Sequence, residues 1–197
     1  SNANATRVGF DLAAGDTLKL QRLGSPSQAT VVQWEAIEFV SGASVQRGKR
    51  SFLTTDLILN VSISPVNLSQ SFVLISVVPN SSSQIIDEQW TVRAQLTSDS
   101  TLELSRNESG IALDVYWQVV SYNGASVQSG LTAIAAGTSS ATAIIASVNP
   151  ATTFLLLTQR GVAAANGIEA QYQVRGRITT PTQLTFDRIS TTNSVEI

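Results

Sequence analysis

The chain has no cysteine, no histidine and no methionine among its 197 residues. The lack of cysteine excludes disulfide bonds, and the lack of both cysteine and histidine excludes zinc sites with the usual nitrogen and sulfur ligands. Catalytic triads that need an imidazole base are excluded for the same reason. The groups that remain for catalysis are carboxylates, lysines, tyrosines and hydroxyls.

Charge is scarce as well. Charged residues make up 13% of the chain, about half of the roughly 25% that is usual in soluble domains. The net charge is −2 and the 12 basic residues are spread along the sequence, so there is no electrostatic footprint for nucleic acid or an anionic membrane. No apolar run reaches the roughly 18 residues that a membrane span needs. We therefore expect neither nucleic-acid binding nor membrane insertion.

What is present is a chain that is 43% hydrophobic and rich in Ser, Thr, Asn, Gln and Ala. This composition argues against disorder and suits strands with a neutral polar outer face. The length allows one large domain or two of about 100 residues each. Residues 1–3, Ser-Asn-Ala, have the form of a tag-cleavage scar, and we expect the rest to be a piece of a longer protein.

The sequence repeats itself with one constant shift, which carries Gly42 onto Gly124 and which we call the repeat shift. The period is about 82 residues, and such a long register without gaps indicates duplication. The first copy contains WEAIEFVSGASVQRG and the second WQVVSYNGASVQSG, with one residue of slip at the tryptophans. The matched stretches are 42–46 with 124–128, 71–74 with 153–156, 90–93 with 172–175, and 102–106 with 184–188.

One part of the unit occurs three times. The stretch VGFDLAAGDTLKLQR at 8–22 has the form of VRAQLTSDSTLELSR at 92–106 and of VRGRITTPTQLTFDR at 174–188. Each copy ends in an arginine, and we expect these three arginines to pair with carboxylates or turn carbonyls. They are Arg22, Arg106 and Arg188.

Nearly every segment alternates apolar and polar residues with a period of two, and turn formers separate the segments at intervals of roughly eight to twelve residues. The pattern predicts an all-β fold of two tandem antiparallel β-sandwich domains, at residues 7–98 and 99–197, related by the repeat. We expect Trp34 and Trp117 to be equivalent and each to be buried in its domain. The Ala-rich stretch LTAIAAGTSSATAIIA is expected to be strand, because the same positions in the first copy alternate as strand.

The unit laid out as VQ-x-G, an aliphatic strand, a V-x-x-x-L hairpin and V-x-W-x-A-I resembles the H-type lectins of snails and slime moulds. The residues that carry the resemblance are Val127 to Gly130, Phe154 to Leu157, Val174 to Ile178 and Trp34 to Glu38. The resemblance implies six-stranded antiparallel sandwiches that trimerise or hexamerise and bind galactose-type sugars between protomers. The aromatic residue or histidine that contacts the sugar in that family has no counterpart in the loop at 106–110.

Five residues are candidates for ligand binding. Trp90 and Tyr172 occupy the same place in the two copies, so a ring there could stack on a sugar, with packing in the core or at its rim as the alternative. Arg93 and Arg175 lie on the strand that carries the sugar-binding arginine in the lectins. Arg47 belongs to a basic cluster present only in the first copy, which is either a solvated loop or a contact for an anionic glycan.

No catalytic signature accompanies these candidates. Asp87 and Glu88 are the nearest approach to a glycosidase pair, but adjacent residues on a strand point to opposite faces. We expect no enzyme activity, no cofactor and no metal. Two roles remain open: a spacer or adhesin-type repeat of an extracellular or cell-surface protein, and a lectin-like carbohydrate-binding module. The expected partners are a glycan or surface protein, neighbouring repeats of the same chain, and other copies of the chain.

Overall fold

The computed structural model describes residues 8–14, 17–22, 31–80, 87–162 and 172–197. Strands dominate this part of the chain, and it contains no α-helix. The strands are β1 (Val8–Ala14), β2 (Thr17–Arg22), β3 (Ala43–Phe52), β4 (Ile58–Ser62), β5 (Ser71–Pro79), β6 (Arg93–Ser98), β7 (Thr101–Ser105), β8 (Leu113–Tyr122), β9 (Ala133–Ile134), β10 (Ser140–Ile144), β11 (Arg160–Gly161), β12 (Arg175–Thr180), β13 (Gln183–Asp187) and β14 (Val195–Glu196). The described residues also include the 3-10 helices η2 (Leu68–Gln70) and η3 (Asp87–Gln89).

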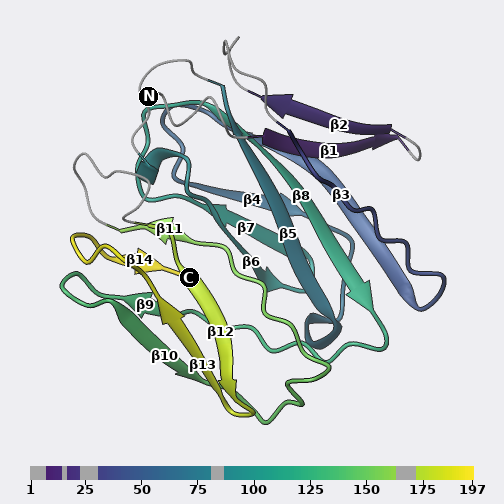
Figure 1. The fold of residues 1–197 in the computed structure, drawn as a ribbon. Coiled ribbons are helices and arrows are strands. Elements are labelled where there is room, and N and C mark those ends of the chain that lie inside the picture. The colour runs from purple at the N-terminus through teal and green to yellow at the C-terminus, as the bar shows by residue number, and fades with distance from the viewer. Residues whose placement is uncertain (1–7, 15–16, 23–30, 81–86, 163–171) are drawn as a thin grey trace.

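The strands pair in small antiparallel sheets, which confirms the predicted all-β class. The strand orders are β1-β2, β3-β8-β5, β4-β7-β6, β10-β13-β12 and β11-β14-β9. Figure 1 shows the sheets of β3 to β8 in the upper part of the molecule and the strands β9 to β14 below them. We call residues 43–122 the first block and residues 125–197 the second block. Within the part of the chain that the structure describes, no helix is long and apolar enough to cross a membrane.

Strand β8 is the central strand of its sheet and shows why these sequences form strands. Its residues pair with β3 on one side and β5 on the other. Successive side chains of a strand point to opposite faces, so one set faces the core. That set is Leu113, Val115, Trp117 and Val119, all buried. The apolar residues of the alternation are therefore buried on the core face, and Asp114 and Val120 of the other face are buried as well.

Two hydrophobic clusters form the core. The first takes its buried side chains from both sheets of the first block, among them Phe52 of β3, Leu104 of β7 and Trp117 of β8. The second lies in the second block and is smaller, with Ile134, Tyr172, Phe186, Val195 and Ile197 as its buried members.

The strand ladders of the two blocks are related by the same repeat shift as the sequence. Ile58 pairs with Ser105 in β4–β7, and Ser140 pairs with Asp187 in β10–β13. The hairpins β6–β7 and β12–β13 also match, including a register shift at 96–98 in one and 178–180 in the other. The sheets β3-β8-β5 and β9-β14-β11 share their order and register in the same way.

Arg106 and Arg188 make equivalent buried contacts, as predicted for turn carbonyls. Arg106 donates to the carbonyl oxygens of Leu53, Asp56, Gln89 and Ile111 at 2.7 to 2.9 Å. Arg188 donates to the carbonyls of Ala135, Thr138 and Asn193, each of which the repeat shift relates to a partner of Arg106. Both guanidinium groups thus tie a loop to the end of the hairpin. The side chain of Arg22 lies outside the described residues.

The prediction for the tryptophans was half wrong. Trp117 is buried with 8% of its surface exposed, but Trp34 is 60% exposed. The segment around Trp34 alternates as a strand, yet residues 31–39 form no ladder and every residue from 31 to 40 is exposed. A strand pattern buries a face only where a sheet is available to pair with it.

In the Ala-rich stretch the expectation of strand is confirmed at β9 and β10, and residues 136–137 between them form a turn. The expected boundary between residues 98 and 99 falls at the tip of the hairpin β6–β7, whose two strands pair with each other. Leu102 and Leu104 of β7 then pack in the first cluster.

Candidate functional site

Trp90 and Tyr172 lie where their blocks meet, but neither presents an open ring. Trp90 is 8% exposed and packs in the first cluster, and Tyr172 is 1% exposed and packs in the second. The Tyr172 hydroxyl donates to Oε1 of the fully buried Glu88 and accepts from Nδ2 of Asn193 at 2.8 Å. In this arrangement Tyr172 cannot stack on a sugar. The burial of both rings agrees with the alternative prediction, that they pack in the core.

Glu88 itself is a residue whose place the sequence did not reveal. It belongs to η3, a 3-10 turn, and not to a strand as the argument against a carboxylate pair assumed. Its partner across the block boundary is Tyr172, 84 residues away. The Glu88 side chain is therefore fully buried, and its hydrogen bond with Tyr172 joins the two blocks.

The two candidate arginines of the hairpin have different surroundings. Arg93 is buried and pairs with Glu196 of the second block at 2.8 Å and with Glu103 at 3.6 Å. Arg175 is exposed and pairs with Asp187 at 3.2 Å within its own block. They are equivalent in sequence, but the structure does not bring them together in one site. Arg93 serves the contact between the blocks.

Arg47, the last of the candidates, is exposed on β3 opposite Gln118. Its neighbour Lys49 pairs with Asp114 at 3.1 Å, and Ser51 donates to the same carboxylate at 2.6 Å. Burial by itself would raise the pKa of Asp114, but hydrogen bonds from Ser51, Lys49 and Asn80 outweigh it and lower this pKa below its ordinary value. The basic cluster is therefore partly neutralised by the strand next to it.

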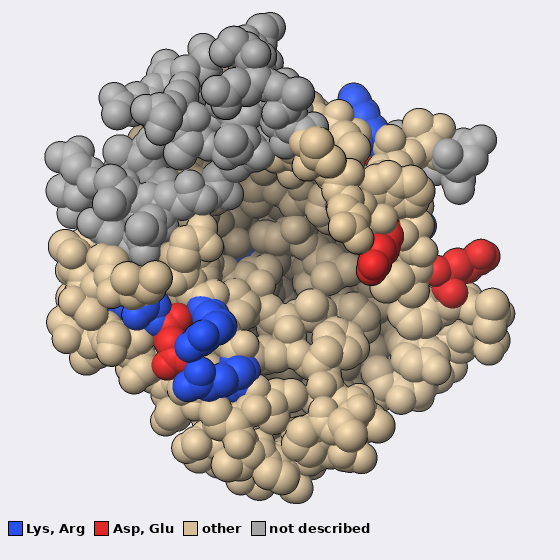
Figure 2. Space-filling model, in the orientation of Figure 1, with Lys and Arg blue, Asp and Glu red and all other residues tan. Residues whose placement is uncertain are grey.

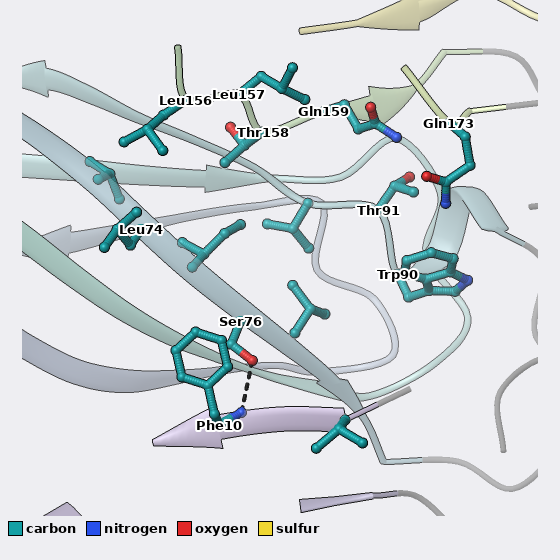
Figure 3. Close-up of a pocket in the computed structure, with 15 residues that line it drawn as sticks. Phe10, Leu74, Ser76, Trp90, Thr91, Leu156, Leu157, Thr158, Gln159 and Gln173 are labelled. Atoms are coloured by element: carbon teal, nitrogen blue, oxygen red, sulfur yellow. Dashed lines mark hydrogen bonds between the residues drawn. The ribbon is translucent and has the colours of Figure 1, made fainter. Parts of the chain in front are cut away.

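A cleft of about 520 Å³ lies between β5 of the first block and residues 156–159 of the second. Figure 3 shows Trp90, Thr91, Gln159 and Gln173 at one end and the apolar side chains of Phe10, Leu74 and Leu156 at the other. Its polar side chains are already engaged within the protein: Thr91 accepts from the Gly161 amide at 3.2 Å, and the Gln159 amide donates to the Tyr172 carbonyl. These bonds make the cleft a seam between the blocks.

The Thr158 hydroxyl extends this seam. It accepts from the Ala94 amide at 3.0 Å and lies 3.3 Å from the Ala94 carbonyl. Because a sugar site needs polar groups that are free to turn toward a ligand, this arrangement serves contact between the blocks better than ligand binding. Among the residues that the structure describes, no cluster of acidic side chains could hold a metal ion.

A larger cleft of about 1050 Å³ belongs mainly to the second block. Residues 124–132 line one side, residues 152–158 line the other, and the floor includes Ile178, Leu184 and Phe186. Figure 2 shows the surface hollowed between the two parts of the molecule, with few charged side chains on this face. The sequence did not reveal this cleft, because residues 154–157 have the pattern of an ordinary strand and a cleft depends on how the stretches pack.

Comparison of the chain with family models, with curated proteins and with solved structures finds no match.

Proposed function

We propose that this chain is a non-catalytic repeat module of an extracellular or cell-surface protein, made of units that each pack two three-stranded sheets around one core. The observation that carries the proposal is the repeat shift, which relates both the ladders and the arginine contacts of the two blocks. A repeated internal framework without a repeated open site is typical of modules that supply length and shape. The neutral polar composition supports a place outside the cell.

The units of this proposal are residues 43–122 and 125–197. The hairpin β6–β7 spans the boundary that the sequence suggested, and β8 is the central strand between β3 and β5. A unit therefore runs from one ASVQ stretch, which begins β3 in the first block, to the central strand before the next ASVQ stretch. Residues 8–40 carry the pattern of the last part of a preceding unit, namely a hairpin and a central strand.

Contacts between the units make the pair suitable as a spacer. Phe72 and Phe154, which are equivalent in the repeat, meet edge to face with ring centres 6.0 Å apart. The ion pair of Arg93 with Glu196 and the bond between Tyr172 and Glu88 lie at the same boundary. A charged pair with both side chains largely buried fixes orientation more than it adds stability. Because the two units contact each other at several points, these contacts fix the orientation of one unit relative to the other.

The proposal is tested by a glycan array with the folded chain and with the double variant Gln159→Ala, Gln173→Ala. A blank array, with circular dichroism that shows intact folding, is the expected result. Saturable binding that disappears in the double variant would overturn the spacer role and establish a lectin at the seam. This variant is preferable to Trp90→Ala, because loss of a core tryptophan would also unfold the first block.

A screen against glycosides, esters and peptides tests the non-catalytic part of the proposal. We expect no turnover. Turnover that Glu88→Gln abolishes, in a variant that melts at the temperature of the parent, would contradict it.

A further inference from the structure

Two hairpins of the molecule meet the residues that follow them through the same hydrogen bond. The Phe10 amide of β1 donates to the Ser76 hydroxyl of β5 at 3.0 Å, the bond drawn in Figure 3. The Ala94 amide of β6 donates to the Thr158 hydroxyl of the second block, also at 3.0 Å. The alignment of the hairpins carries Phe10 onto Ala94, and the repeat shift carries Ser76 onto Thr158. We call these contacts joint 1 and joint 2, and they have the same register.

Each joint covers the edge of a small sheet. Strand β6 is an edge strand of the sheet β4-β7-β6, and among the described strands β1 pairs with β2 alone. Edge strands carry unpaired main-chain groups that other strands can bind. A hydroxyl can donate and accept, and that of Thr158 accepts from the Ala94 amide and lies 3.3 Å from the Ala94 carbonyl oxygen. The hydroxyl therefore satisfies the edge residue without adding a strand.

The alternation of β5 directs the hydroxyl of joint 1 toward the hairpin. Val73, Ile75 and Val77 pack against the first cluster, so Ser76 points to the opposite face of the sheet. Ser76 is nevertheless buried, because β1 lies over it. A two-stranded hairpin by itself is marginally stable in water. The order of β1–β2 therefore depends on this face of β5.

Beside the shared hydroxyl, the joints differ in one pair of residues. In joint 1 Gly9 lies against Val78, and a β-carbon added to Gly9 would overlap Cγ2 of Val78. Joint 2 has arginine at both corresponding places. Arg93 and Arg160 donate to the same carboxylate oxygen of Glu196, at 2.8 and 2.7 Å. Joint 1 therefore depends on a small residue, and joint 2 depends on charge.

The acidic residue of joint 2 has a counterpart that serves another purpose. The repeat shift carries Asp114 onto Glu196, but Asp114 binds Lys49 and Ser51 inside the first block. An arginine in place of Gly9 would therefore meet a valine, with the nearby carboxylate already held by two partners.

We propose that the hydroxyl of Ser76 or Thr158 is a repeated docking site for the hairpin edge of the preceding unit, and that the residue pair beside it decides which hairpin docks. The site on β5 accepts a hairpin with glycine at the place of Gly9. The site on the second block accepts one with arginine there. The partner of each surface is an edge strand of a neighbouring repeat. Such matching keeps similar units of one chain from packing in the wrong order.

This inference rests on the repeat units of the proposed function and names the surfaces through which they meet. The two can fail separately. A positive glycan array would end the spacer role and leave both joints in place, because neither joint is a sugar site. Failure of the exchange experiments below would remove the joints and leave a blank array blank.

Amide hydrogen exchange of the whole chain, resolved by NMR, tests the shared hydroxyl. We expect the amides of Phe10 and Ala94 to be protected in the parent. Ser76→Ala and Thr158→Val remove the acceptors, so each should speed exchange of its own amide about tenfold or more. Ser76→Thr and Thr158→Ser are the matched controls, since each introduces the residue of the other joint. They should leave the rates within about threefold of the parent.

The β3–β8 ladder in the same spectra reports whether the first block is folded, so a misfolded variant is recognised and the other joint decides. Protection of Ala94 that survives Thr158→Val would contradict the proposal. So would a loss in Thr158→Ser as large as in Thr158→Val, because the hydroxyl would then not be the cause.

Gly9→Ala tests the residue pair of joint 1, and the double variant Gly9→Ala, Val78→Ala is its rescue. The added β-carbon should release the hairpin, so that the amides bonded between β1 and β2 exchange about tenfold faster or more while the β3–β8 ladder stays protected. Once Val78 is shortened, the nearest atoms to the new carbon are Ser76 Oγ at 3.3 Å and Cβ of residue 78 at 3.4 Å. Protection should then return, and a double variant that stays unprotected would count against the pair.

The exchange variant Gly9→Arg, Arg93→Gly tests whether the hairpins are interchangeable, because it leaves composition and net charge unchanged. We expect the β1–β2 ladder and the Ala94 amide both to lose protection. Parent-like protection at both joints would show that the pair does not select the hairpin. Fast exchange of the β1–β2 ladder in the parent itself would show that this hairpin is not docked, and would overturn the proposal.

Discussion

The two blocks share the registers of their strand ladders, but the strands of one sheet differ in length between them. In the first block β8 has ten residues, and its neighbours β3 and β5 have ten and nine. In the second block the central strand β14 has two residues, and so do both neighbours. The flanking sequences are similar, with GASVQ at the start of each. In both blocks the flanking stretches are strand only where residues of a central strand pair with them.

The other sheet of each block does not depend on that strand. The sheets β4-β7-β6 and β10-β13-β12 have equal registers. Arg106 and Arg188 also make the same kind of contact in both blocks. The hairpin sheet and its arginine therefore form a local framework that the two blocks share.

The largest expected effect comes from removing the ring that fills the first core. We expect Trp117→Ala to lower the free energy of unfolding of the first block by about 3–5 kcal/mol, because a large buried side chain leaves a cavity. Trp34→Ala should change it by less than about 0.5 kcal/mol in dilute, monomeric protein. Urea unfolding followed by circular dichroism measures both. Equal losses in the two variants would mean that Trp34 is buried in solution.

The next effect tests the framework that the two blocks share. Arg106→Met should cost about 3 kcal/mol, because it leaves carbonyl oxygens of three loops without their buried donor. Arg188→Met should cost a similar amount in the second block, since its contacts are the same. Hydrogen exchange assigns each loss to its block. A loss confined to Arg106→Met would show that the second arginine does not hold its loop.

The sequence predicted the parts of the molecule that depend on local repetition. The repeat shift of the sequence also relates the strand pairings of the two blocks. The terminal arginines of the hairpins were expected to pair with carboxylates or turn carbonyls, and Arg106 and Arg188 bind carbonyls. The sequence misplaced Trp34, because alternation in VVQWEAIEF shows that a strand can form and not whether a partner exists. The seam of Thr91, Thr158 and Gln159 could not be predicted either, since it depends on how two blocks pack.

A smaller effect distinguishes the two acidic residues at equivalent places, Asp114 and Glu196. Asp114 binds Lys49 and Ser51 inside its block, whereas Glu196 binds Arg93 and Arg160. Because folding lowers the pKa of Asp114, its contribution is present above the unfolded pKa of about 4. It is lost as the pH falls through the folded pKa. Asp114→Asn should cost about 1–2 kcal/mol at pH 7.

The pH dependence provides the check on this pair. Unfolding of the parent and of Asp114→Asn between pH 7 and pH 2 should converge as the carboxylate of the parent becomes protonated. Glu196→Gln serves as the control, because it should loosen the contact between the blocks and leave the first block intact. A constant difference between the parent and Asp114→Asn down to pH 2 would contradict the assignment.

The smallest expected effect is that of Lys49→Ala. The Lys49 side chain is 48% exposed and forms an ion pair with Asp114. An exposed lysine of this sort contributes about 0.5 kcal/mol or less, and Ser51 keeps a hydrogen bond to the carboxylate. Thermal melts at low and high salt measure it. A loss as large as that of Asp114→Asn would place the stabilising charge on the lysine.

The order of strands along the chain determines the order in which the ribosome synthesises them. In the first block the middle strand of the sheet is the last to be made, since β8 follows both β3 and β5. At translation rates of about 5–20 residues per second, the ribosome needs about 2–7 seconds to pass from the end of β5 to the start of β8. Through that interval β3 and β5 have no partner between them. A nascent chain halted before residue 113 should therefore bind chaperones that recognise exposed apolar strands, and one halted well after residue 122 should release them.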